Sequence, residues 1–182
     1  MMHLRNFLIT MISISAFSCS KDVENPNPNE EGELITTVVL SLTDSLGNRI
    51  TTSWKDLSPN DASGRTIDTL ILKDSVSYTG RIYFLDETKN PVDSITKEIE
   101  AERNDHLIVY KPVSPLTTSS FKVTRTDLDQ NNLETGLAFS LRTLSKGTGG
   151  LNVILRHQPG EKDGTETPGD TDVDIIFPMV IR

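Results

Sequence analysis

The stretch SYTGRIYFL (residues 77–85) decides the fold class of this chain. Positions 78, 80, 82 and 84 carry Tyr, Gly, Ile and Phe, whereas the positions between them include Thr79 and Arg81. Alternation with a period of two is typical of a β-strand that turns one face toward a core. The pattern therefore predicts a strand at these residues.

Similar short stretches recur along the chain, separated by Gly, Pro, Asn and Asp. Residues 34–42 and 49–54 flank the turn sequence SLGN (45–48), which predicts a hairpin. Further strands are expected at 66–72, 107–113, 120–126, 136–144, 150–157 and 172–181. About nine short strands at this spacing predict an all-β fold, a single antiparallel β-sandwich of Ig-like or transthyretin-like type over residues 34–182.

Residues 92–105 do not follow the period of two. Ile95 and Ile99 lie four positions apart among charged residues, a spacing that favours one face of a short helix. An edge strand that carries charges to deter pairing with other chains would have nearly the same composition. Both interpretations remain open, with the helix slightly favoured.

The first 18 residues have the features of a signal peptide. His3 and Arg5 precede the apolar residues 7–17, and Ser18 stands just before Cys19, the single cysteine of the chain. A small residue followed by cysteine resembles a bacterial lipobox, although Ala16 and Phe17 depart from its strict pattern. We expect cleavage before Cys19 and acylation of Cys19, with chains such as palmitate.

Residues 19–33 contain one apolar side chain besides the cysteine, Val23, and are expected to form a flexible acidic tether. Acids soon after the lipidated cysteine resemble a signal for the outer face of the outer membrane. Because Val23 interrupts them, placement on the periplasmic face stays open, and a plain solvated linker is an equal alternative to a sorting signal. With a formal net charge of −8 and no basic run, the chain is not expected to bind nucleic acid, and acyl chains must supply the anchoring in outer-membrane lipid.

Signatures of catalysis are missing from the sequence. It has no Gly-x-Ser-x-Gly turn, no His-Glu-x-x-His motif and no glycine-rich phosphate loop, so no catalytic residue is assigned and an enzyme is not expected. A lone cysteine also excludes an internal disulfide or a cysteine zinc site. The protein is therefore expected to bind rather than to catalyse.

Two histidines, His106 and His157, remain after the signal peptide, and each stands at the end of an expected strand. If the two ends meet near an acid, the imidazoles could bind zinc or copper, or one of them could ligate haem iron. The commoner role of such a histidine is to cap a strand. Whether these ends meet depends on strand pairing that the sequence does not specify.

The segment DLDQNNLE (127–134) resembles the start of a calcium loop. Oxygen ligands would come from Asp127, Asp129, Asn131 and Glu134, but Asn132 replaces the glycine that lets such a loop turn. An ordinary connection between two strands has the same composition. Calcium and a plain hairpin connection are both retained as interpretations.

Several motifs together resemble uncharacterised β-sandwich lipoproteins of Bacteroidetes-type bacteria. They are GELITTV (32–38), SYTGRIYFLDE (77–87), NPV (90–92) and LRHQP (155–159). The resemblance implies a small sandwich on a lipid tether and a partnership with outer-membrane import machinery. It provides no catalytic residues to carry over.

These observations lead to one expected function and two alternatives. We expect a lipid-anchored extracytoplasmic binding or accessory module that assists outer-membrane import of metal, haem or sugar, with a TonB-dependent transporter as partner. One alternative is a structural or adhesive cell-surface protein. The other is an envelope hydrolase.

Overall fold

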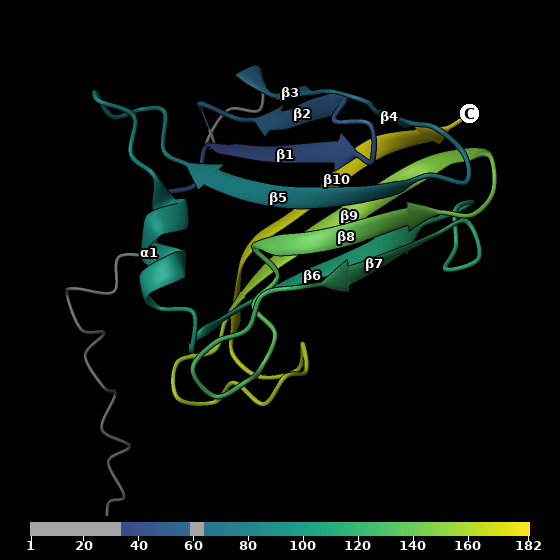
Figure 1. Cartoon of the computed structure of the whole chain (residues 1–182). Coiled ribbons are helices and arrows are strands. Elements are labelled where there is room, and N and C mark those ends of the chain that lie inside the picture. The colour runs from purple at the N-terminus through teal and green to yellow at the C-terminus, as the bar shows by residue number, and fades with distance from the viewer. Residues whose placement is uncertain (1–33, 59–63) are drawn as a thin grey trace, which may run out of the picture. The chain divides into compact units, whose positions relative to one another are not determined.

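The computed structural model of the protein describes residues 34–58 and 64–182. Within them, ten strands and one helix form a sandwich of two sheets, so the expected all-β sandwich is confirmed (Figure 1). The signal peptide, Cys19 and the tether lie outside the described residues, and so these expectations remain predictions. None of the described helical structure is long and apolar enough to cross a membrane.

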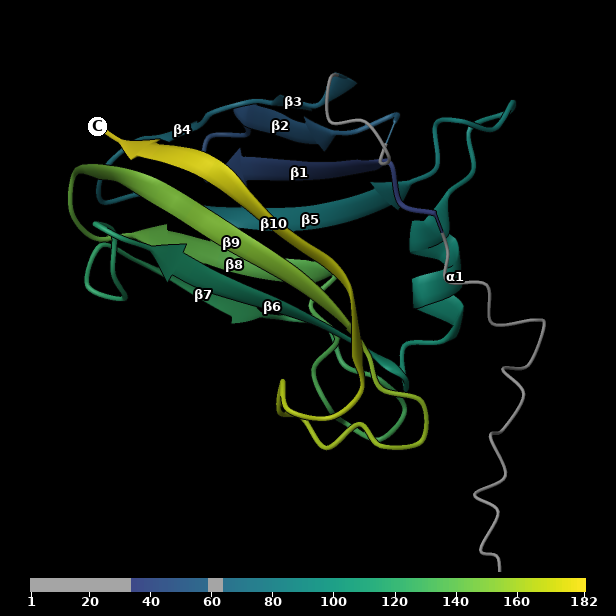
Figure 2. The ribbon, with the colours of Figure 1, turned by 180° about the vertical axis from the view of Figure 1, so that it is seen from behind.

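The larger sheet has six strands and the smaller sheet has four. Spatial order in the larger sheet is β3 (Thr66–Ile67), β2 (Arg49–Lys55), β1 (Thr37–Asp44), β5 (Ser77–Leu85), β8 (Ala138–Thr143) and β7 (Phe121–Arg125). The smaller sheet runs β4 (Leu70–Leu72), β10 (Asp170–Ile181), β9 (Gly147–His157) and β6 (His106–Val113), and Figure 2 turns it toward the viewer. The expected hairpin is confirmed, since β1 and β2 pair antiparallel.

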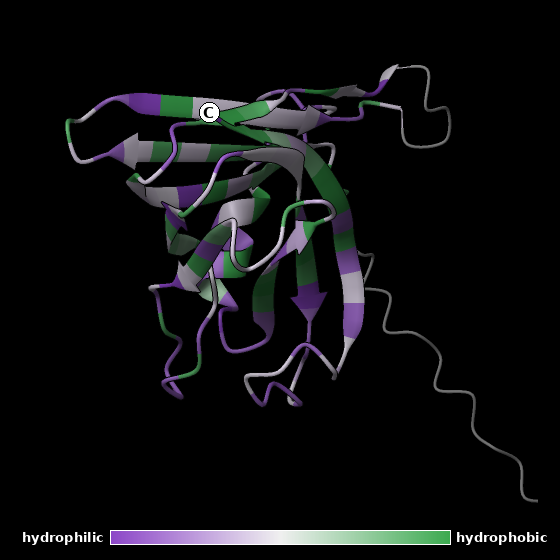
Figure 3. Ribbon diagram, turned by 90° about the vertical axis from the view of Figure 1, so that its right-hand side faces the viewer, coloured by the Kyte–Doolittle hydropathy of each residue, from purple (hydrophilic) through white to green (hydrophobic). Residues whose placement is uncertain are grey.

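The core lies between the sheets because alternate residues of each strand point inward. Fully buried residues come from both layers, namely Val38, Leu40 and Leu42 on β1, and Leu151, Val153 and Leu155 on β9. Figure 3 shows this alternation as bands of hydrophobic and hydrophilic residues along the strands. Each such side chain stabilises the fold by roughly 1.5–3 kcal/mol through burial.

On β5, the strand that predicted the fold, a glycine has a packing role. Gly80 pairs with Phe139 on β8. A Cβ atom added at Gly80 would lie 2.4 Å from two ring atoms of Phe139, much closer than van der Waals contact allows. The ring therefore lies directly over the glycine, and the position leaves no room for a side chain.

The strand expected at 66–72 is wrong as a single element. Residues 66–67 form β3 in the larger sheet, whereas residues 70–72 form β4 in the smaller one, where β4 pairs parallel with β10. The chain changes sheets at Asp68, whose carboxylate accepts hydrogen bonds from the backbone N–H and the hydroxyl of Ser53 (3.0 and 2.7 Å). These bonds hold the crossover at its start.

The helix expected within 92–105 is present as α1 (Ile95–Ala101). Ile95 and Ile99 are both buried, as their spacing predicts. The Thr96 hydroxyl accepts a hydrogen bond from Phe84 N–H (2.8 Å) and lies 3.1 Å from the Phe84 carbonyl oxygen. The helix is thus fixed to the end of β5 and covers one end of the sandwich (Figure 1).

Candidate metal centre

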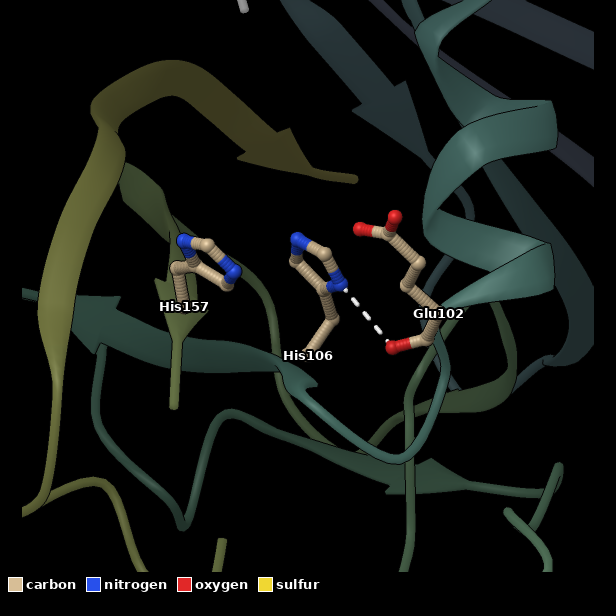
Figure 4. Close-up of side chains that lie close together, drawn as sticks. All are labelled: Glu102, His106 and His157. Atoms are coloured by element: carbon tan, nitrogen blue, oxygen red, sulfur yellow. Dashed lines mark hydrogen bonds between the residues drawn. The ribbon is translucent and has the colours of Figure 1, made fainter. Parts of the chain in front are cut away.

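Three side chains that can ligate a metal lie together where α1 ends and β6 begins. They are Glu102, His106 and His157, and their ligand atoms all lie within 4.8 Å of one another (Figure 4). Only two of the three were candidates from sequence. The structure therefore answers the question that the sequence left open, because the two histidines do meet.

Strand pairing explains why the histidines meet. His106 begins β6, His157 ends β9, and the antiparallel register places them directly opposite each other. Ile108 and Leu155, which lie two positions from His106 and His157 on the same strands, are buried in the core. Both imidazoles therefore point to the inner side of the sheet, where the rings stack with centroids 4.7 Å apart and planes 8° apart.

Glu102 contributes its backbone as well as its carboxylate. It follows the last residue of α1, and its carbonyl oxygen lies 3.1 Å from Nδ1 of His106. Because a carbonyl only accepts hydrogen bonds, Nδ1 must carry the proton. The Nε2 atom of neutral His106 then keeps a free lone pair, the tautomer that a metal-binding histidine with a backbone partner adopts.

The surroundings of His106 favour its neutral form. Its side chain is buried, since the residue is only 5% exposed. Burial lowers the pKa of His106, the hydrogen bond to Glu102 partly opposes this, and the neighbouring His157 lowers the pKa further. Metal binding near neutral pH would therefore not have to displace a proton from Nε2.

The stacked arrangement is not itself a coordination geometry. An imidazole lone pair lies in the plane of its ring, and two parallel stacked rings have separate planes, so one ion cannot meet both lone pairs. One ring has to rotate about its terminal torsion, which is broad for histidine. His157 is the less buried ring, while His106 is held by Glu102, and so His157 is the ring free to turn.

A second acidic residue, Asp172 on β10, lies near the two histidines. Although Asp172 is partly exposed, partial desolvation raises its pKa, while the charges of His157 and His106 lower it in part. Sequence analysis missed Glu102 and Asp172, because each stands on an element whose position relative to the histidines depends on the fold. A four-residue spacing joins Glu102 to His106, but it crosses the end of the helix.

The four proposed calcium ligands lie in the loop between β7 and β8, two strands that pair antiparallel, and the described residues show no convergence of the carboxylates of Asp127, Asp129 and Glu134. The Asp127 carboxylate accepts the backbone N–H groups of Gly136 and Leu137 (2.8 and 3.0 Å). Asn132 has a φ of 61°, the left-handed conformation expected at the glycine position of such a loop. This Asp127 carboxylate therefore closes the base of a hairpin connection.

The other acids of this loop have cationic partners from the protein. Asp129 Oδ2 lies 2.9 Å from Lys162 Nζ, while Oδ1 accepts the N–H groups of Asn131 and Leu133. Glu134 pairs with Arg125 at 2.7 Å. Lys162 occupies the position on Asp129 that a calcium ion would need, so this geometry favours the plain hairpin connection over calcium.

The three-ligand cluster at the start of β6 is the arrangement that best fits a functional site. Two imidazoles and a carboxylate are ligands suited to zinc, copper, nickel or iron(II). Three protein ligands also leave a coordination position open. Comparisons of the chain with protein-family models, with curated proteins and with solved structures find no match in any of the three.

Proposed function

We propose that the protein is a lipid-anchored extracytoplasmic accessory module that binds a divalent transition metal and passes it to an outer-membrane importer. The observation that carries the proposal is the convergence of Glu102, His106 and His157 within 4.8 Å. The anchor at Cys19 and the tether of residues 19–33 are the part that rests on sequence. Together they would hold a metal site outside the cytoplasm on the expected lipid anchor.

An incomplete ligand set suits transfer better than storage. Structural zinc sites are closed by four protein ligands, whereas three ligands leave a position for water or for an incoming group. A partner could supply a ligand at that position and so take the ion. The lowered pKa of His106 also supports metal capture at neutral pH, since its Nε2 then carries no proton that the metal would have to displace.

The site and the start of the folded chain share one end of the sandwich. Thr36, near the beginning of the described residues, donates its backbone N–H to the carbonyl of Leu85 at the end of β5 (2.9 Å). The chain then reaches α1 within ten residues of Leu85. With an anchor attached before Thr36, the distance from the metal site to the membrane would therefore be limited by the length of the tether.

Metal titration tests the proposal directly. The mature chain with Cys19→Ser should bind Zn²⁺ or Cu²⁺ with a one-to-one stoichiometry in isothermal titration calorimetry. His157→Ala and Glu102→Gln should each weaken binding by at least about 10-fold, because each removes a ligand. Absence of one-to-one binding by the unsubstituted site would overturn the metal function.

Glu100→Gln is the matched control. Glu100 stands on α1, two residues before Glu102. Its exposed carboxylate pairs with Arg81 at 2.8 Å and is not part of the ligand cluster. Its removal should leave affinity within about twofold, since exposed ion pairs contribute little. Equal losses in the Glu100 and Glu102 variants would mean that binding is a diffuse charge effect.

The partner requires a separate experiment in native membranes. The acylated protein should be recovered with a TonB-dependent transporter after cross-linking of intact outer membranes. Deletion of the gene should slow growth when the metal is limiting. Recovery of no transporter, together with normal growth at limiting metal, would refute the import role even if metal binding is real.

A further inference from the structure

Strand β10 contains an irregularity next to the metal cluster. It pairs one-for-one with β9 from Val173 opposite Leu155 onward, and again where Asp170 stands opposite His157. Between Thr171 and Val173 the register shifts, so Asp172 is an extra residue with no partner of its own. It is a β-bulge, a feature that redirects a side chain and is frequent beside functional sites.

The bulge changes where an acidic side chain can go. Val173 points into the core, and regular alternation would put residue 172 on the opposite, outer face of the sheet. With an extra residue in the strand, this alternation is broken just where β10 passes His157. The bulge places Asp172 two residues along β10 from Asp170, the direct partner of His157. Its carboxylate is not one of the ligand atoms that lie within 4.8 Å of one another, so it has to approach an ion held there.

The carboxylate of Asp172 is also available to bind an ion. Among the described residues it makes no hydrogen bond or ion pair, and only burial and neighbouring charges influence its pKa. Asp174, two residues further on the same strand, differs in this respect, because its carboxylate accepts a hydrogen bond from the side chain of Asn152 (2.6 Å). Asp172 is therefore a free acidic group beside two imidazoles, and it remains exposed to solvent.

We infer that Asp172 is the fourth ligand of the metal site, and that it joins when His157 turns out of the stack. The inference rests on the proposed function, since it concerns the same site. In the structure the two rings stack and Asp172 is partly exposed to solvent, where an incoming cation would meet it first. The ion then draws His157 toward β10 and closes a set of two nitrogens and two oxygens.

This ligand set specifies the class of metal. Two imidazoles and two carboxylates balance the charge of a divalent ion and suit tetrahedral Zn²⁺, whereas copper(I) prefers sulfur and calcium prefers six or more oxygens. A fourth ligand on an exposed bulge can also be withdrawn without unfolding the sandwich. Asp172 would thus be the ligand that a partner displaces when the ion is transferred.

The test compares two acids of the same strand in the mature Cys19→Ser chain. Asp172→Asn should weaken Zn²⁺ binding by at least about 10-fold, whereas the control Asp174→Asn should stay within about twofold. Cobalt(II) provides a second readout, because the intensity of its visible absorption reports tetrahedral coordination. Loading with Co²⁺ should give an intense band that falls markedly in Asp172→Asn and is unchanged in Asp174→Asn.

The possible failures can be told apart. Equal Zn²⁺ affinity and equal Co²⁺ spectra for Asp172→Asn and the parent would overturn the role of Asp172 and leave the three-ligand site intact. Absence of binding by the parent chain would overturn the proposed function and this inference with it. Asp172→Glu, which keeps the carboxylate on a longer arm, should recover part of the affinity, and loss equal to that of Asp172→Asn would count against direct ligation.

Discussion

Replacing Lys162 by Met should destabilise the fold in a way that depends strongly on pH. Lys162 Nζ lies 2.9 Å from Asp129 Oδ2, and the two side chains are only 2% and 0% exposed. Lys162 also donates a hydrogen bond to the carbonyl of Arg103 (2.8 Å). Met keeps the aliphatic volume of the side chain but removes the charge, so the carboxylate of Asp129 is left buried without its cation.

The loss in the free energy of unfolding depends on which form of the buried Asp129 carboxyl, ionised or protonated, has the lower free energy. Burying an unpaired charge costs about 3–5 kcal/mol. Protonating the carboxyl at pH 7 instead costs about 4 kcal/mol, from an ordinary pKa of about 3.9 at 1.36 kcal/mol per unit. Asp129 Oδ1 keeps the backbone N–H groups of Asn131 and Leu133, which offset part of this cost, and so we expect a loss of about 2–3 kcal/mol.

The pH dependence follows from the sign of the pKa change. Burial alone would raise the pKa of Asp129, but Lys162 and two backbone N–H groups outweigh it and lower the pKa in the parent protein. The parent therefore keeps this stabilisation above about pH 4 and loses it as the pH falls through the lowered pKa. Without Lys162 the pKa rises, so the deficit of the variant should shrink to about 1 kcal/mol at pH 4.5.

Urea unfolding followed by the fluorescence of Trp54, the single tryptophan, measures both values. Lys111→Met is the control, since Lys111 pairs with Glu166 at the surface, with side chains 44% and 46% exposed, and should cost less than about 1 kcal/mol. A deficit for Lys162→Met that is below about 1 kcal/mol at pH 7, or that is equal at pH 7 and 4.5, would refute the reasoning.

Two further substitutions test packing and protonation. Gly80→Ala should lower the melting temperature by about 3–8 °C, because a clash with the Phe139 ring costs about 1–3 kcal/mol and exceeds the gain of up to about 1 kcal/mol from a stiffer unfolded chain. Gly64→Ala, with nothing within 4 Å of the new Cβ, should change it little, and equal melting temperatures for both variants would contradict the packing argument. His106→Gln should flatten the stability profile below about pH 6.5, because burial lowers the pKa of His106 and the unfolded chain of the parent gains the proton first. Parallel pH profiles of the urea midpoint for parent and variant would show that another group is responsible.

Local pattern predicted most of the fold. The alternation at 77–85 corresponds to β5 residue for residue, and the spacing of Ile95 and Ile99 identified the buried face of α1. The division of 66–72 into β3 and β4 was not predictable. It depends on a hydrogen bond from Ser53 to Asp68 and on pairing between Leu70 and Met179, and neither partner is local in sequence.

The candidate site was predictable only in part. Both histidines stand at the ends of recognisable strands, but their meeting requires β6 to pair with β9 and not with its neighbours in sequence. Asp172 could not be assigned, because a bulge is created by the register between two strands. Glu102 lies where the helix ends, and helix ends are the least certain feature of any pattern.

The parallel pairing of β4 with β10 bears on how such a protein could be exported. Leu70 and Met179 are partners separated by more than a hundred residues, so β4 has no neighbour in its sheet until β10 has emerged. In a chain that crosses a membrane pore from its N-terminus, β4 could not pair with β10 until most of the chain had crossed. If the protein is exported as its sequence predicts, the smaller sheet would be completed only after β10 has crossed.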